Sequence, residues 1–163
     1  LGHDLRGGEK SLQLYHQLSG RAGRTGKPSK VYFQTYNLNE DIIFQITDKD
    51  PFIFLNKELN LRRKNNLPPF EKFVSLILTS KDEKKLEIES FKLRDYLLGK
   101  INGKILGPVN ASIYRIKKQY RNRLLIRSKK TSRIHKSLSL ALKKFKLSSG
   151  IKLTVDVDPI NFN

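Results

Sequence analysis

A double proline, Pro68-Pro69, divides the chain into two parts with different hydrophobic patterns. Two successive prolines interrupt a helix or strand, because each lacks a backbone N–H and restricts the residue before it. After the prolines, apolar residues recur with a period of either two residues or 3.6 residues. The two periods alternate in the order β-α-β-β-α-β, which limits the second part to an α+β arrangement.

Two split βαβ units in this order predict a ferredoxin-like fold, an antiparallel sheet with both helices on one face. The predicted strands are residues 73–79, 111–117, 123–128 and 151–157, and the predicted helices are residues 82–98 and 132–147. The hairpin is expected to turn near Gln119–Asn122. Thr131 or Ser132 is expected to cap the second helix and Gly150 to close it.

The part before the prolines shows weaker patterns. The predicted elements are a helix at residues 9–22, a strand at Val31–Tyr36, a short helix at residues 39–46 and a helix that begins at Pro51. Leu12 and Tyr15 are expected on the buried side of the first helix. Asp50 is expected to cap the last helix, which should end before the double proline.

Positive charge is concentrated after the prolines. The 163-residue chain holds 33 Lys and Arg against 15 Asp and Glu, a net charge of +18. Residues 96–155 contain 16 basic residues and no acidic one. Such a surface predicts a polyanionic partner, and nucleic acid is the favoured one. A membrane is disfavoured, because the chain lacks both an 18-residue apolar run and a Trp-rich amphipathic helix.

The predicted hairpin gathers basic residues together with two tyrosines. Lysine and arginine neutralise backbone phosphates, and an exposed aromatic ring stacks on an unpaired base. The predicted nucleic-acid contacts are Arg115, Lys117, Lys118, Tyr120, Arg121 and Arg123 in the hairpin and Lys129, Lys130 and Arg133 at the start of the next helix. Packing is the favoured interpretation of Tyr114. Because no base-reading element is recognisable, structure-selective binding is expected.

The segment QLSGRAGR at residues 17–24 places two arginines three residues apart. Arginine pairs bidentately with phosphate oxygens, and at a transferring γ-phosphate it stabilises the charge of the transition state. Arg21 and Arg24 are therefore candidate catalytic residues. Gly20 and Gly23 would keep side chains away from a nucleotide. As a short pattern alone, the segment also fits a basic helix end followed by a loop.

The segment resembles motif VI (QxxGRxGR) of superfamily 2 helicases, and the chain as a whole resembles the C-terminal portion of the primosomal replication-restart helicase family, PriA. The family's KVxxQT, ELxxR…PPF, LGPxxA and DVDP segments occur in order, starting at Lys30, Glu58, Leu106 and Asp156. The resemblance implies that residues 1–46 end the second RecA-like α/β helicase lobe, residues 47–69 form a helical linker and residues 70–163 form the DNA-binding C-terminal domain.

The resemblance implies an ATP-dependent DNA helicase that recognises stalled or branched forks and D-loops and restarts replication by primosome assembly. Gln17, Arg21 and Arg24 match the motif residues at the γ-phosphate, and either arginine could be the finger. ATP and Mg²⁺ would be held mainly by residues outside this chain, which contains neither a P-loop nor a DExH box, so the chain alone is expected to be inactive. With no cysteine and three scattered histidines, no metal site is expected here; the family's zinc would bind upstream.

The implied partners are branched and single-stranded DNA, single-stranded DNA-binding protein and primosome proteins, in the bacterial cytoplasm at the nucleoid. Two other classes of function fit part of the sequence. A free-standing basic nucleic-acid-binding module without catalysis fits the charge, and a ribosome-associated scaffold fits the charge and topology. The helicase motif favours the enzyme. Because the chain begins with Leu1 and contains no methionine, a longer native polypeptide is expected.

Overall fold

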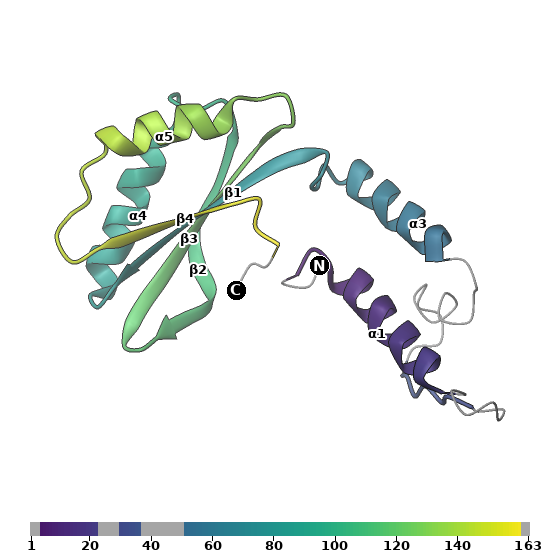
Figure 1. Cartoon of the computed structure of the whole chain (residues 1–163). Helices are drawn as coiled ribbons and strands as arrows, with labels where there is room; N and C mark the ends of the chain where they lie inside the picture. Colours follow the sequence, from purple (N-terminus) through teal and green to yellow (C-terminus); the bar gives the residue numbers. More distant parts are fainter. Residues whose placement is uncertain (1–3, 23–29, 37–50, 161–163) are drawn as a thin grey trace. The chain divides into compact units, whose positions relative to one another are not determined.

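The computed structural model describes residues 4–22, 30–36 and 51–160 (Figure 1). The chain divides into two compact units, Leu1–Leu61 and Arg62–Asn163, with the boundary inside one helix. The described residues form four helices and four strands. None of these helices is both long enough and apolar enough to cross a membrane.

The first unit contains α1 (Gly7–Arg21) and most of α3 (Pro51–Lys64). Leu12 is buried, as predicted, and Phe54 of α3 is buried as well. Around Asp4, at the start of α1, the Arg6 N–H donates to Oδ1 at 2.8 Å and the Lys10 ammonium lies 2.6 Å from Oδ2. These two hydrogen bonds lower the pKa of the Asp4 carboxyl, and the one from Lys10 has the larger effect.

The strand predicted at Val31–Tyr36 is wrong, because residues 30–36 form no strand. A strand needs a hydrogen-bonded neighbour, and the described part of the first unit supplies none. Phe33 instead meets the edge of the Tyr15 ring, with centroids 5.1 Å apart. The helix predicted at residues 39–46 and the Asp50 cap lie outside the described residues.

The second unit follows the predicted order β-α-β-β-α-β. Its elements are β1 (Glu71–Ser80), α4 (Glu83–Leu97), β2 (Lys104–Ile116), β3 (Gln119–Lys129), α5 (Ile134–Lys144) and β4 (Lys152–Val157). All paired strands are antiparallel, in the order β2-β3-β1-β4. The α+β class is therefore confirmed, with β1 and β3 inside the sheet and β2 and β4 at its edges.

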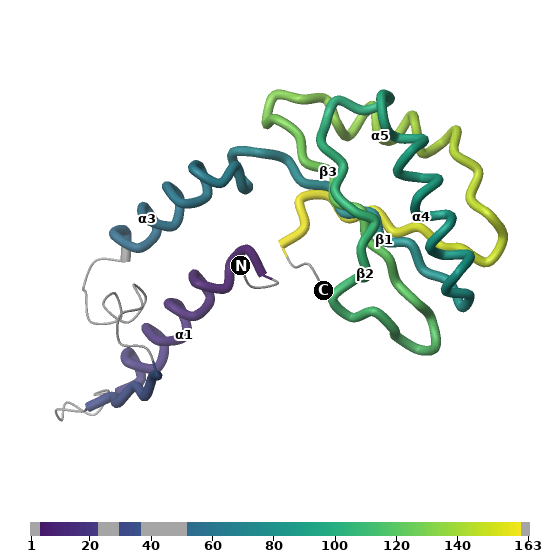
Figure 2. The backbone as a smooth tube through the Cα atoms, turned by 180° about the vertical axis from the view of Figure 1, so that it is seen from behind, coloured from purple at the N-terminus to yellow at the C-terminus, as the bar shows by residue number. Residues whose placement is uncertain are grey.

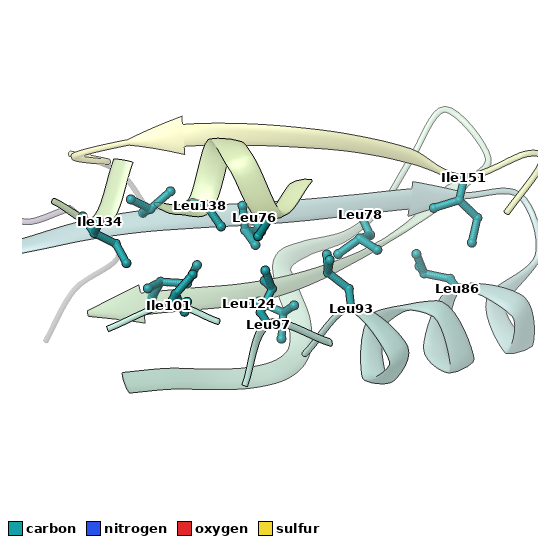
Figure 3. Packing of buried hydrophobic residues seen from close by; sticks show 13 residues of the cluster. Leu76, Leu78, Leu86, Leu93, Leu97, Ile101, Leu124, Ile134, Leu138 and Ile151 are labelled. Atoms are coloured by element: carbon teal, nitrogen blue, oxygen red, sulfur yellow. The ribbon is translucent and has the colours of Figure 1, made fainter. Parts of the chain in front are cut away.

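The core lies between one face of the sheet and the two helices. On that face β1 contributes Leu76 and Leu78, and β3 contributes Leu124, all with 0% exposure. In Figure 3 the leucines of α4, Leu93 and Leu97 among them, point at this face. Alternate residues of a strand point to opposite faces, so the odd-numbered residues of β3 lie on the other side of the sheet. The turn of the β2–β3 hairpin lies outside this core and is exposed.

Three local predictions about the second unit are wrong. The hairpin turns at Lys117-Lys118, two residues before the predicted turn, because β3 begins four residues earlier than the predicted strand at 123–128. The N-cap of α5 is Arg133, and no side chain caps the helix. Gly150, at φ +81°, forms the turn before β4 and does not close α5, which ends at Lys144.

A buried carboxylate holds the loop between α5 and β4. Glu89 of α4 is 2% exposed and accepts hydrogen bonds from the Ser148 N–H at 2.9 Å and from its hydroxyl at 2.8 Å. We expect Glu89→Ala to lower the free energy of unfolding by about 2–3 kcal/mol, because both charge-assisted bonds are lost inside the protein. Urea unfolding followed by circular dichroism measures the change. The exposed neighbour in Glu87→Ala should cost under about 0.5 kcal/mol; equal losses would contradict the assignment.

Candidate nucleic-acid interface

Two lysines form the tip of the β2–β3 hairpin. Ile116 pairs with Gln119, so Lys117 and Lys118 make a two-residue turn, with φ values of 48° and 63°. Such turns favour Asn and Gly, because a positive φ strains most other residues by about 1 kcal/mol or more. Both lysines are exposed. The turn therefore displays two cations at the tip in place of the residues that would relax it.

The neighbouring Arg115 adds a third exposed cation to the tip. Its guanidinium carbon lies 5.0 Å from the centroid of the Tyr120 ring, within the range of a cation–π contact. Tyr120 is half-buried and packs against the core, and the Tyr114 ring lies 5.4 Å from it. We call Arg115, Lys117 and Lys118 the tip cluster. Stacking of Tyr120 on a base stays a prediction.

The two other arginines of the hairpin make contacts inside the protein. The ladder between β2 and β3 is interrupted between Leu106 and Val109 and again between Asn110 and Arg115. In the second interruption, Arg121 donates to the Ile113 carbonyl at 3.2 Å. Arg123 donates to the Ser112 hydroxyl at 3.3 Å.

Arg123 is 8% exposed, so little of its guanidinium reaches the surface. Burial lowers the pKa of Arg123, and the charge of Arg121 lowers it further. The usual pKa of arginine is so high that the side chain stays charged at neutral pH. The position of Arg123 shows a role within the sheet, and contacts of Arg121 and Arg123 with DNA stay a prediction.

Tyr114 connects the hairpin to the start of α4. Its hydroxyl donates a hydrogen bond to the carboxylate of Glu83. This bond, more than burial or the charge of Glu83, raises the pKa of Tyr114 to about 12. Because the pKa of Tyr114 in the folded chain lies above the ordinary tyrosine pKa of 10.0, the stabilisation is present below pH 10 and is lost as the pH rises through about 12.

A spectrophotometric titration tests this contact. We expect one of the six tyrosines of the chain to ionise last, near pH 12, and Tyr114→Phe to remove that late step. Glu83→Gln should shift the same step toward lower pH, because the neutral amide no longer disfavours tyrosinate. A late step that persists in Tyr114→Phe would contradict the assignment.

The second predicted cluster lies at the opposite end of β3 from the turn (Figure 2). Lys129, Lys130 and Arg133 are all exposed. Lys129 and Arg133 line a cavity of about 1270 Å³. The start of α5 also lines this cavity, and the positive end of a helix adds to the attraction for an anion.

Sequence reasoning missed three further basic residues of this cavity: Lys100, Lys104 and Arg127. Arg127 lies 3.0 Å from the carboxylate of Glu71 and donates to the Asn66 carbonyl at 3.0 Å. Within the described part of the chain, Glu71 is the one carboxylate that lines the cavity. Both lysines lie within the acid-free stretch, so a charge census of residues 100–104 could have indicated them.

The described residues of the motif VI segment lie at the end of α1. Gln17, Gly20 and Arg21 are exposed, and Gln17 and Arg21 share a helix face at a spacing of four residues. A Cβ added to Gly20 would have no neighbour within 4 Å. Gly23 and Arg24 lie outside the described residues, so the pairing of the two arginines remains a prediction. Among residues 4–22, 30–36 and 51–160, no group of three or more His, Asp or Glu side chains could hold a metal ion.

Comparison with known proteins shows which family this chain resembles. The family model described as "Primosomal protein N C-terminal domain" matches residues 63–160. Proteins named "Replication restart protein PriA" match almost the whole chain. The relative from Rickettsia conorii is 37% identical over 160 residues, which are 98% of this chain and 24% of the relative.

Relatives from other organisms give similar matches. The relative from Synechocystis is 36% identical over 163 residues, with 98% of this chain and 19% of the relative covered. The relative from Bacillus subtilis is 32% identical over 162 residues, with 96% and 20% covered. The chain therefore spans about a quarter to a fifth of the length of these relatives.

Proposed function

The chain belongs to the family of the primosomal protein N C-terminal domain, and from this membership we propose that it is the C-terminal part of an ATP-dependent DNA helicase that restarts replication. The relatives named as replication restart proteins support the assignment to replication restart. The observation that carries the DNA-binding role is the tip cluster, three exposed cations at the end of an edge hairpin.

The proposal assigns a different part of the helicase to each unit. The strand order β2-β3-β1-β4 supports the ferredoxin-like arrangement for the second unit, as the C-terminal DNA-binding domain. In the first unit, large apolar side chains such as Leu14, Tyr32 and Phe52 are 55%, 84% and 67% exposed. Exposed apolar surface of this kind supports an interface with other protein, and the proposed neighbour is the rest of the second helicase lobe.

DNA binding by the tip cluster would be electrostatic and would select structure over sequence. Lysine and arginine contacts with phosphate carry no sequence information. The proposed ligands are therefore branched and single-stranded DNA, such as stalled forks and D-loops. The cluster of Lys129, Lys130 and Arg133 is proposed as a second contact with phosphates.

Salt dependence tests the electrostatic part of the proposal. If about six phosphates are neutralised, the logarithm of the binding constant should fall with the logarithm of salt concentration with a slope of about −5. The double variant Lys117→Ala/Lys118→Ala should make the slope shallower by about 2. Fluorescence anisotropy with labelled forked DNA measures both slopes.

The matched control is Lys143→Ala/Lys144→Ala, which removes the same charge from the exposed last turn of α5. It should change the slope much less than the hairpin variant. A slope near zero for the unsubstituted chain, or equal changes in the two double variants, would overturn the role of the tip cluster.

The catalytic part of the proposal concerns motif VI. Arg21 and Arg24 would approach the γ-phosphate of ATP, with Gln17, Gly20 and Gly23 around them. Magnesium and most of the nucleotide contacts, like the family's zinc, would belong to the remainder of the helicase. The exposed position of Arg21 at the end of α1 supports an approach to a site outside this unit.

Substitution in the complete helicase tests this part. Arg21→Ala and Arg24→Ala should each abolish DNA-stimulated ATP hydrolysis and leave DNA affinity largely intact, because stabilisation of the transition state is lost but the DNA contacts are not. Lys57→Ala, which removes another exposed cation of the same unit, should retain activity. Unchanged hydrolysis in both arginine variants would favour the alternative function, a basic nucleic-acid-binding module without catalysis.

The proposed protein partners follow from the family. Single-stranded DNA-binding protein and primosome proteins would meet the helicase at the fork, in the bacterial cytoplasm and at the nucleoid. The separate core of the second unit supports the alternative module as well, because a unit with its own core could bind nucleic acid on its own.

A further inference from the structure

The outer part of the hairpin is weakly attached to the sheet on its β2 side, whereas β3 stays paired with β1 as far as Tyr120, opposite Ser80. Beyond the interruption between Asn110 and Arg115, the ladder resumes only for the two pairs Arg115–Tyr120 and Ile116–Gln119. β2 is an edge strand whose one neighbour in the sheet is β3, and two pairs hold a strand only weakly. Without other contacts, this outer run of β2 would move relative to β3, and Arg115 and the two turn lysines would move with it.

Three side-chain hydrogen bonds reach this weak region. Arg121 and Arg123 of β3 donate to acceptors of Ile113 and Ser112, as described above. Tyr114 donates to Glu83 of α4. All three bonds involve consecutive residues of β2, within the run that separates the two parts of the ladder. Together they connect this run to a neighbouring strand on one side and to a helix on the other.

We propose that the contact between Tyr114 and Glu83, supported by Arg121 and Arg123, is a specificity determinant: it fixes the orientation of the tip cluster and thereby makes the chain prefer branched over linear DNA. The proposal rests on the DNA-binding role proposed above. Charge alone attracts any phosphate backbone. Discrimination between DNA shapes requires cations held in a fixed orientation, so that both arms of a junction are met without reordering the hairpin.

Two observations agree with a rigid tip. The strained backbone of Lys117 and Lys118 persists only where the surrounding structure determines it. Glu83 is an acidic residue close to a basic hairpin, where it would repel DNA phosphates. Its position is explained by the hydrogen bond that it accepts from the Tyr114 hydroxyl. A carboxylate in the first turn of α4 also interacts favourably with the helix dipole.

The test compares the affinities of the full chain for a forked DNA and for a linear duplex of equal length. Tyr114→Phe removes one hydroxyl and no charge. We expect it to lower the ratio of fork affinity to duplex affinity by about fivefold, the worth of one hydrogen bond. The salt slope for linear duplex should stay unchanged, because no phosphate contact is removed. Glu83→Ala breaks the same contact from the helix side and should lower the ratio similarly.

Tyr96→Phe is the matched control, because it also removes one tyrosine hydroxyl, which donates to the Ala141 carbonyl at 3.2 Å. It should leave the ratio unchanged. Lys117→Ala/Lys118→Ala should weaken binding to both DNAs together and make both salt slopes shallower. Circular dichroism checks that every variant keeps its helices and strands.

Each outcome bears on one proposal. A ratio that stays the same in Tyr114→Phe and Glu83→Ala, or a fall that Tyr96→Phe reproduces, overturns the orientation role and leaves the DNA-binding role standing. A ratio of one for the unsubstituted chain also overturns it. Absence of binding to either DNA rejects the proposed function itself.

Discussion

The contact between one face of the sheet and two helices is the interaction on which the second unit depends. Leu76 and Leu78 of the inner strand β1 are fully buried there, and each such side chain contributes roughly 1.5–3 kcal/mol. Because both helices pack on the same face, the opposite face and the β2–β3 hairpin are left uncovered by them. The basic residues at the tip of the hairpin therefore lie outside this core, and their exposure leaves its packing unchanged.

The sequence predicted the core well, because the core follows from local periodicity. Leu86, Leu93 and Leu97 recur at helical spacing and are buried together, and the mostly apolar run at Phe73–Thr79 indicated β1. The strand predicted at Val31–Tyr36 is wrong, because strand formation does not depend on local sequence alone. Residue type there favours a strand, but a strand also needs a neighbour, and pairing between distant segments leaves no local trace in composition.

The charge of the proposed interface is visible in the sequence, but the positions of its residues are not. Sequence reasoning treated Arg115, Lys117, Arg121 and Arg123 as one basic surface. The structure separates exposed cations at the tip from arginines that contact β2, because the interruptions of the ladder create acceptors for Arg121 and Arg123. The hydrogen bond between Tyr114 and Glu83 joins residues 31 positions apart, so no spacing rule could indicate it. Charge is thus visible in the sequence, and orientation comes from long-range contacts.

The central claim is that DNA meets this chain at the tip of the β2–β3 hairpin. Hydrogen–deuterium exchange of the chain with and without forked DNA tests it most directly, since the readout is resolved along the sequence. DNA is expected to slow exchange most strongly in peptides that cover residues 113–120, with little change in α4. Slower exchange confined to the helices, with the hairpin unchanged, would rule out binding at the tip.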